Sequence, residues 1–247
     1  MTRMHWIVLL VVGVLTVGCA GGQGSHEASE INTQLGVSYM QQGNFNQASE
    51  SLEKALEQNS RNAGAHAAKA VLSERLEEYD EADHHFRRSL RLDDEQPSVR
   101  NNYGRFLCNR GRFDEADEQF QYAIDDSLYE RRHVALANAG LCALRDDRTA
   151  EAEDYLRRAL EREPRFASAL RHMARLRFED GDHLGARGYY QRFTEVGNQS
   201  ASTLLLGVQI ERALDNRDEA ASYALRLRSQ YPDSEEAREL RELERDD

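Results

Sequence analysis

The sequence predicts an all-α fold in which pairs of helices repeat along the chain, and three observations predict it. The 247 residues are 31% charged and 40% hydrophobic and include only three prolines, a composition that favours long helices with a soluble surface. Small residues recur near the middle of successive helical segments, at intervals of 34, 34, 36, 34 and 33 residues. Alanines follow them at a nearly constant offset, so each interval holds two helices. The small residues are Gly36, Ala70, Gly104, Gly140, Ala174 and Gly207.

A period of about 34 residues is typical of the tetratricopeptide repeat (TPR), a helix-turn-helix unit that stacks on copies of itself. The second helix of each unit carries an alanine twelve or thirteen residues after the small residue. We therefore predict a right-handed TPR superhelix of six repeats over residues 30–232, in which each repeat buries its apolar face against the next. These alanines are Ala48, Ala82, Ala116, Ala152, Ala186 and Ala220.

A glycine inside a helix costs about 1 kcal/mol relative to alanine, so Gly104 needs a reason. We predict that the two helices of a repeat approach closely there and that a Cβ at residue 104 would displace Ala116 and its neighbours. Close approach of a ligand is the alternative, and packing is the favoured interpretation. Gly111 is expected to form the turn between the helices. The same packing role is predicted for Gly36, Gly140, Ala152 and Gly207.

The N-terminal residues differ from the rest of the chain. The stretch "MTRMHWIVLLVVGVLTVGC" has a basic start and a short apolar run, which predicts a signal peptide over residues 1–18. Its end, "LTVGC", resembles a bacterial lipobox, with Thr16 where leucine is preferred. The resemblance implies lipidation of Cys19, which becomes the mature N-terminus, and Ala20 after it favours the outer membrane. An ordinary signal anchor ending near Gly22 is the alternative.

The segment after the signal is expected to be a flexible tether over residues 19–29, because "AGGQGSHEAS" is rich in glycine and serine and lacks apolar periodicity. At the other end, residues 233–247 predict a capping helix. Asp233 or Ser234 would cap its N-terminus, and Ala237 and Leu240 would lie on its apolar stripe. A frayed tail is the alternative.

The composition and motifs argue against several function classes. An isoelectric point near 5.2 disfavours a nucleic-acid partner, since phosphate neutralisation requires excess Lys and Arg. The chain has no nucleophile elbow, phosphate-binding loop, dinucleotide-binding glycine motif or His-Glu-x-x-His pair. His84 and His85 are adjacent on a helix and point about 100° apart, so they do not form an i, i+4 metal pair. We expect no enzyme activity, metal, cofactor or small-molecule substrate.

Two further cysteines lie on the first helices of neighbouring repeats, since Cys108 and Cys142 are 34 residues apart. Export would place both in an oxidising compartment, where a suitably spaced pair forms a disulfide. We predict this bridge. Two buried free thiols acting as small apolar residues are the alternative.

The first helices of stacked repeats line the inner surface of a superhelix, so their polar residues beside the packing position predict a partner-binding groove. Asn and Arg side chains suit an extended peptide, because they bind its backbone and carboxylates through directed hydrogen bonds. A row of solvated polar residues is the alternative for any one of them. The groove residues are Asn101, Asn102, Arg105, Asn109, Asn138, Arg171, His172, Arg175 and Phe178.

The strings "NNYGRFLCNRGRFDEA" and "ANAGLCAL", together with six repeats and the lipobox, resemble the type IV pilus biogenesis and stability lipoproteins (PilF/PilW). The resemblance extends over nearly the whole chain. It implies an outer-membrane pilotin, anchored by acyl chains, that binds secretin subunits and promotes their assembly into the multimeric pilus pore. A general periplasmic scaffold for envelope or peptidoglycan-enzyme assembly is the second hypothesis, and an enzyme accessory domain is the third.

Overall fold

The structure is a computed structural model and describes residues 20–245. Thirteen helices and no strands are present in that range, which confirms the all-α prediction. The helices are α1 (Ala20–Gln41), α2 (Phe45–Gln58), α3 (Ala63–Arg75), α4 (Tyr79–Leu92), α5 (Pro97–Asn109), α6 (Phe113–Asp125), α7 (Arg132–Arg145), α8 (Thr149–Arg162), α9 (Ala167–Glu179), α10 (His183–Thr194), α11 (Ala201–Ala213), α12 (Arg217–Gln230) and α13 (Glu235–Leu243).

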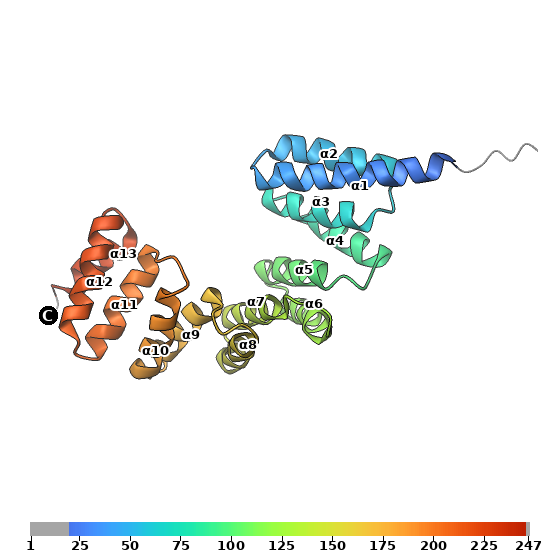
Figure 1. The fold of residues 1–247 in the computed structure, drawn as a ribbon. Helices are drawn as coiled ribbons and strands as arrows, with labels where there is room; N and C mark the ends of the chain where they lie inside the picture. The colour runs from blue at the N-terminus through green and yellow to red at the C-terminus, as the bar shows by residue number, and fades with distance from the viewer. Residues whose placement is uncertain (1–19, 246–247) are drawn as a thin grey trace, which may run out of the picture. The chain divides into compact units, whose positions relative to one another are not determined.

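The helices form consecutive antiparallel pairs, α1 with α2 through α11 with α12 (Figure 1). The chain divides into two compact units, which meet in the sequence between Leu92 and Asp93. In the first unit, α3 packs against both helices of the preceding pair. In the second unit, α5 contacts α7 and α9 contacts α11, so the first helices of these repeats lie side by side.

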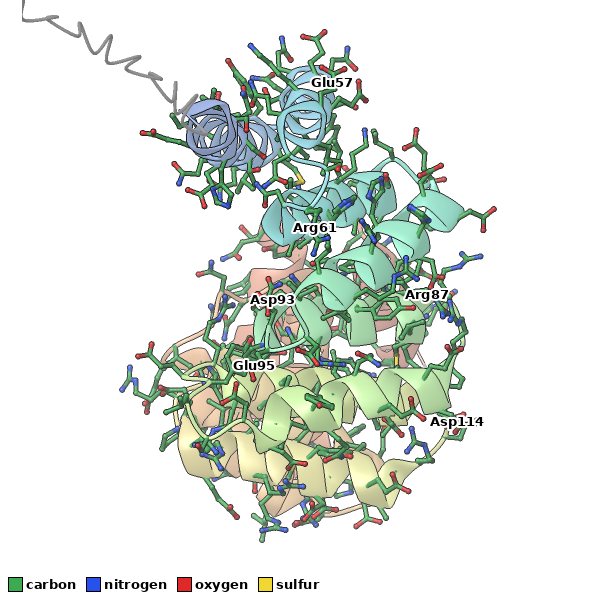
Figure 2. The ribbon with its side chains drawn as sticks, turned by 90° about the vertical axis from the view of Figure 1, so that its right-hand side faces the viewer. Glu57, Arg61, Arg87, Asp93, Glu95 and Asp114 are labelled. Carbon is green, nitrogen blue, oxygen red and sulfur yellow. A yellow bond between two sulfur atoms is a disulfide. The ribbon has the colours of Figure 1, made fainter. Side chains whose placement is uncertain are left out.

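Apolar residues at helical spacing explain why the pairs form. In α6, Ala116, Phe120, Ala123 and Ile124 fall on one face and are buried against the partner helix. Charged residues occupy the opposite faces, and the side chains of Glu57, Arg87 and Asp114 point away from the helix pairs into solvent (Figure 2).

Gly104 is where the two helices of the third repeat approach most closely. An ideal Cβ on residue 104 would lie 2.8 Å from Phe120 Cδ1 and 3.1 Å from the carbonyl oxygen of Ala116. An ideal Cβ on Gly140 would lie 3.0 Å from Leu156 Cγ and 3.2 Å from the carbonyl oxygen of Ala152. The predicted close approach is therefore present in these repeats. An ideal Cβ on Gly36 would lie 2.6 Å from Leu52 Cγ.

At Gly207 the side chain nearest to a Cβ comes from the preceding repeat. A Cβ there would meet the hydroxyl oxygen of Tyr190 at 2.6 Å. The position that holds Leu52 and Phe120 in other repeats is here the small residue Ala224. The Tyr190 hydroxyl donates to the carbonyl oxygen of Thr203 at 2.8 Å.

The turn inside each helix pair contains one residue with positive φ. Gly43, Gly111 and Gly181 adopt φ of 77°, 73° and 81°, as their role in the turns predicts. The other three repeats place a carboxylic acid at the equivalent position, with φ between 57° and 63°. These are Glu77, Asp147 and Asp215.

The N-terminal part of the first unit corrects one prediction. Helix α1 begins at Ala20, so residues 20–29 are helical, whereas the sequence predicts a flexible tether there. Side-chain hydrogen bonds hold the end of this stretch: the buried Ser29 hydroxyl donates to the carbonyl oxygen of Ala55 at 2.7 Å and accepts from Asn62 Nδ2 at 2.9 Å. The turns of α1 before Ser29 extend past the end of α2 (Figure 1).

The C-terminal helix α13 packs on α11 and α12. Its N-terminus is capped by Ser234, whose hydroxyl oxygen accepts from the backbone N–H of Ala237 at 3.1 Å. Ala237 and Leu240 are fully buried. The predicted signal peptide and the lipidation at Cys19 lie outside the described residues. Within residues 20–245, no helix is long and apolar enough to cross a membrane.

Candidate functional site

The predicted groove residues on α5 divide into buried and accessible ones. Asn101 is only 5% exposed, and its Oδ1 accepts from Asn138 Nδ2 at 2.9 Å. This bond joins α5 to α7, so the amide of Asn101 serves the contact between repeats and is removed from the candidate groove. Asn102 and Arg105 are half-buried, and Asn109 is exposed.

Arg145 extends the site and was missed by the sequence analysis. Its Nη1 donates to Asn109 Oδ1 at 2.5 Å, which links the C-terminal ends of α5 and α7. The signal was available, because Arg145 stands five residues after Gly140, as Asn109 stands five residues after Gly104. On the fourth repeat only Asn138 was expected in the groove, and Arg145 was not among the predicted residues.

On α9, the structure brings Arg171 and His172 together. Arg171 Nη2 donates to His172 Nε2 at 3.0 Å. Burial, with the positive charges of Arg171 and Arg175 acting in the same direction, lowers the pKa of His172 to about 4. The imidazole is therefore neutral at pH 7 and acts as an acceptor. Arg175 is exposed and lies 3.8 Å from Glu179.

Phe178 is placed differently from the other predicted groove residues. Its ring packs near the ring of His183, with centroids 5.4 Å apart. His183 begins α10, so Phe178 lies at the turn of the fifth repeat and is half-buried there. It supports the turn and offers little surface to a partner.

The two cysteines of the second unit are joined. Cys108 on α5 and Cys142 on α7 form a disulfide in the structure, with Cα atoms 5.7 Å apart. Both residues are buried. The bridge and the Asn101–Asn138 hydrogen bond therefore connect the same two first helices, which fixes the register of the third repeat against the fourth.

The accessible groove residues that remain are mostly cationic. Arg105, Arg145, Arg171 and Arg175 stand on three first helices of a chain whose net charge is −12. Guanidinium groups bind carboxylates and peptide carbonyls with directed hydrogen bonds. Beside them, the half-buried amide of Asn102 offers both a donor and an acceptor. This cationic row is suited to binding an acidic or extended peptide segment.

Three histidines of the first unit lie close together. His66 Nδ1 and His85 Nδ1 are 2.8 Å apart, and His84 lies beside His85 with ring centroids 5.3 Å apart. Among the described residues, no group of three or more His, Cys, Asp or Glu side chains is arranged to hold a metal ion.

Comparison with known proteins gives the family. A tetratricopeptide repeat model matches residues 33–97, 68–128, 104–162 and 138–201, and another matches residues 202–234. The chain is 36% identical over 245 residues to the type IV pilus assembly protein PilF of Pseudomonas aeruginosa, covering 96% of this chain and 97% of that protein.

Solved structures agree. A structure of Pseudomonas aeruginosa PilF superposes with a TM-score of 0.82 at 38% identity, covering 88% of this chain and 98% of that one. The structure of PilW, a widely conserved type IV pilus biogenesis factor, gives a TM-score of 0.78 at 33% identity over 86% of this chain and 97% of that one. This chain therefore belongs to the PilF/PilW family of type IV pilus biogenesis proteins, which are built from tetratricopeptide repeats.

Proposed function

We propose that this chain is an outer-membrane lipoprotein pilotin, which binds secretin subunits and promotes their localisation and multimerisation during type IV pilus biogenesis. The observation that carries the proposal is the similarity to PilF over 96% of the chain. PilF is a type IV pilus assembly protein, and a solenoid of helix pairs acts by binding other proteins. The role proposed for this chain is binding, without catalysis.

The N-terminal sequence supports a membrane anchor. The lipobox-like "LTVGC" ends at Cys19, and two or more acyl chains give stable anchoring at about 0.8 kcal/mol per buried CH₂. Ala20 already belongs to α1. An acylated Cys19 would therefore hold the first repeat near the membrane and raise the effective concentration of the repeats for a membrane-bound partner.

The cationic row supports the binding step. Arg105 and Arg175 each directly follow the small residue that packs the first helix against the second, so they occupy equivalent positions two repeats apart. A secretin segment lying along these helices would meet a guanidinium at both positions. Charge reversal at both should weaken binding without disturbing the core, since neither residue is buried.

The anchor is tested with Cys19→Ala expressed in a strain that lacks the chromosomal copy. We expect a folded protein that leaves the outer-membrane fraction, with fewer secretin multimers on a gel and reduced twitching. Normal secretin multimers in this variant would contradict the pilotin role.

The groove is tested with the double variant Arg105→Glu/Arg175→Glu, with Arg238→Glu on the exposed face of α13 as a control. Mild crosslinking followed by recovery of the lipoprotein should yield about fivefold less secretin from the double variant and an unchanged amount from the control. Unchanged secretin in the double variant would remove the groove from the proposal. Recovery of peptidoglycan enzymes in place of secretin would favour a general periplasmic scaffold.

A further inference from the structure

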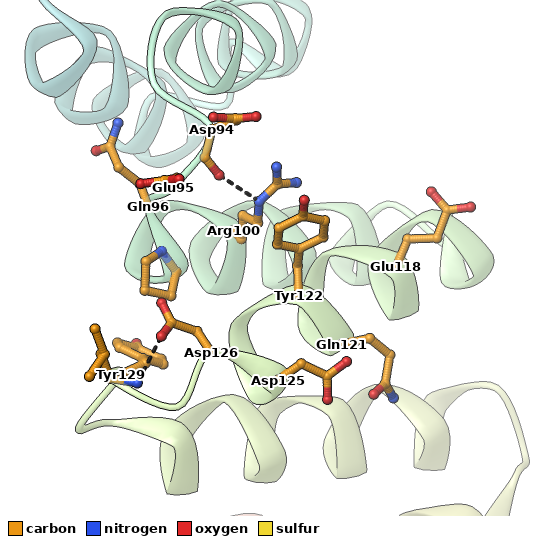
Figure 3. A pocket seen from close by; sticks show the side chains of 12 residues that line it. Asp94, Glu95, Gln96, Arg100, Glu118, Gln121, Tyr122, Asp125, Asp126 and Tyr129 are labelled. Carbon is orange, nitrogen blue, oxygen red and sulfur yellow. Dashed lines mark hydrogen bonds between the residues drawn. The ribbon is translucent and has the colours of Figure 1, made fainter.

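A large cavity within the second unit is lined by none of the residues of the cationic row and lies at the edge of the third repeat. It has a volume of about 1040 Å³ and largely apolar walls, at the upper end of the range of about 300–1,000 Å³ that holds a drug-sized ligand. Its residues come from the loop before α5, from the first turns of α5, from α6 and from the segment between α6 and α7 (Figure 3). They are Asp94, Glu95, Gln96, Pro97, Arg100, Glu118, Gln121, Tyr122, Asp125, Asp126, Leu128 and Tyr129.

Two large apolar side chains in this cavity are open to solvent. Leu128 is 88% exposed and Tyr122 is 59% exposed. Asp126 Oδ1 accepts from the backbone N–H of Leu128 at 2.8 Å, which fixes the turn that carries this leucine. Exposed apolar side chains held in a hollow are typical of a surface that another molecule covers.

The single cation of the cavity is already engaged. The Arg100 guanidinium lies 3.7 Å above the ring of Tyr122, and its Nη1 donates to Gln119 Oε1 at 3.0 Å. Arg100 Nε donates to the carbonyl oxygen of Asp94 at 3.2 Å (Figure 3). Arg100 therefore positions Tyr122 as a wall of the cavity.

The remaining charges in the lining are all negative. The lining has five carboxylates and one guanidinium, so its net charge is −4. The carboxylates come from three different segments around the apolar floor. A cationic occupant would be attracted from every side, while the anionic surface of a lipid bilayer would be repelled. The carboxylates are Asp94, Glu95, Glu118, Asp125 and Asp126.

We propose that this cavity, the acidic cup, docks a basic protein segment in which lysine or arginine alternates with a bulky aliphatic side chain. The aliphatic side chain would cover Leu128 and Tyr122, and the flanking cations would pair with the surrounding carboxylates. This occupant has the opposite charge preference to the cationic row, so the two surfaces select different segments. The cup binds its segment whether or not the cationic row binds secretin. If both surfaces bind, one molecule holds two partner segments at once.

The probe is a fluorescein-labelled peptide, Gly-Ser-Lys-Leu-Lys-Leu-Lys-Ser-Gly, titrated with the full chain in non-ionic detergent and followed by fluorescence anisotropy. We expect saturable binding with a dissociation constant between about 10 μM and 1 mM, weakened by added salt. Peptides with glutamate in place of lysine, or alanine in place of leucine, should bind at least about tenfold more weakly. Equal binding of the glutamate peptide, or no saturation by the lysine peptide, would overturn the proposal.

Variants locate the binding to the cup. Asp125→Lys changes a carboxylate at the C-terminal end of α6, where a cation also suits the helix dipole, and it should weaken peptide binding about tenfold. Glu195→Lys makes the same change at the end of α10 and should leave binding unchanged. Leu128→Ser should weaken binding about fivefold, while Leu225→Ser, at another exposed leucine on α12, should not. Equal effects of a variant and its matched control would overturn the proposal.

Discussion

The ring of Phe120 occupies the space that a side chain on residue 104 would need, since a Cβ there would come within 2.8 Å of both Phe120 Cδ1 and Cε1. The carbonyl oxygen of Ala116 closes the space from the other side at 3.1 Å. Backbone and ring are both held by packing, because Phe120 and Ala116 are fully buried. Gly104 is thus required by the distance between α5 and α6.

We predict that Gly104→Ala lowers the free energy of unfolding by about 1–3 kcal/mol, the usual cost of overpacking a core. Urea denaturation measures it. Gly188→Ala is the matched control, because Gly188 lies in α10 with nothing within 4 Å of its Cβ position; there alanine should stabilise by about 0.5–1 kcal/mol. A Gly104→Ala protein as stable as the parent would contradict the packing explanation.

The turn residues allow a second prediction, which concerns the cost of a left-handed backbone conformation where no neighbouring atom restricts the side chain. Gly111 has φ of 73° and nothing within 4 Å of its Cβ position, so Gly111→Ala should cost about 1–2 kcal/mol from the left-handed conformation alone. Glu77→Gly at the equivalent turn should stabilise by about 0.5 kcal/mol, since relief of strain exceeds the extra chain entropy. Thermal unfolding of the two variants should shift in opposite directions, and shifts of the same sign would contradict the argument.

The disulfide between Cys108 and Cys142 is predicted to form when the protein is in an oxidising compartment. Intact mass spectrometry without reduction should show two hydrogens fewer than the reduced chain and no thiol at either position open to alkylation. Closing a loop with a sequence separation of 34 contributes roughly 3–4 kcal/mol in the chain-entropy model. Cys108→Ser/Cys142→Ser should therefore melt at a lower temperature than the oxidised parent. Identical melting with and without reductant would count against the bridge.

Stability should fall between pH 6.5 and pH 4 because of two histidines. Burial, assisted by the charges of His66, His84 and Lys69, lowers the pKa of His85 to about 4, and burial also lowers that of His172 to about 4. In this range the unfolded chain binds more protons than the folded one, so acid favours unfolding. The two neutral histidines contribute fully to the free energy of unfolding above the unfolded pKa near 6.5, and this contribution is lost as pH falls toward 4.

Melting temperatures at pH 7.5 and pH 5.0 test this. In His85→Gln/His172→Gln the difference between the two temperatures should shrink, because neither glutamine titrates. His26→Gln, at an exposed histidine of α1, should keep the parent's difference. If the double variant keeps it too, other groups cause the acid sensitivity.

The helix pairs were predictable because the first five repeats share a local pattern: a small residue, an alanine twelve residues on, and a large residue four after that. The pattern did not identify the nearest neighbour of Gly207, which is Tyr190 of the preceding repeat. A neighbour from another repeat depends on how the repeats stack, which a single period does not encode.

The groove was predicted less well, for a related reason. The position of a residue along the helix showed whether it flanks the packing glycine. It did not show whether a neighbouring helix buries that residue. Asn101 is buried because Asn138 of the next repeat donates to it, and Phe178 turns toward His183. The tether prediction relied on glycine content and missed the hydrogen bonds of Ser29 to the following helices.

The part of α1 that extends past α2 has a consequence for how the protein would stand on a bilayer. Residues 20–28 form the part of α1 before Ser29, whose hydroxyl bonds to α2, and at about 1.5 Å per residue they form a rod about 13 Å long. With acyl chains on Cys19, this helical segment would act as a rigid spacer of constant length between the bilayer and the first repeat. The repeats would then be presented at a constant height and angle above the lipid, so partners emerging from the membrane would meet the same surface each time.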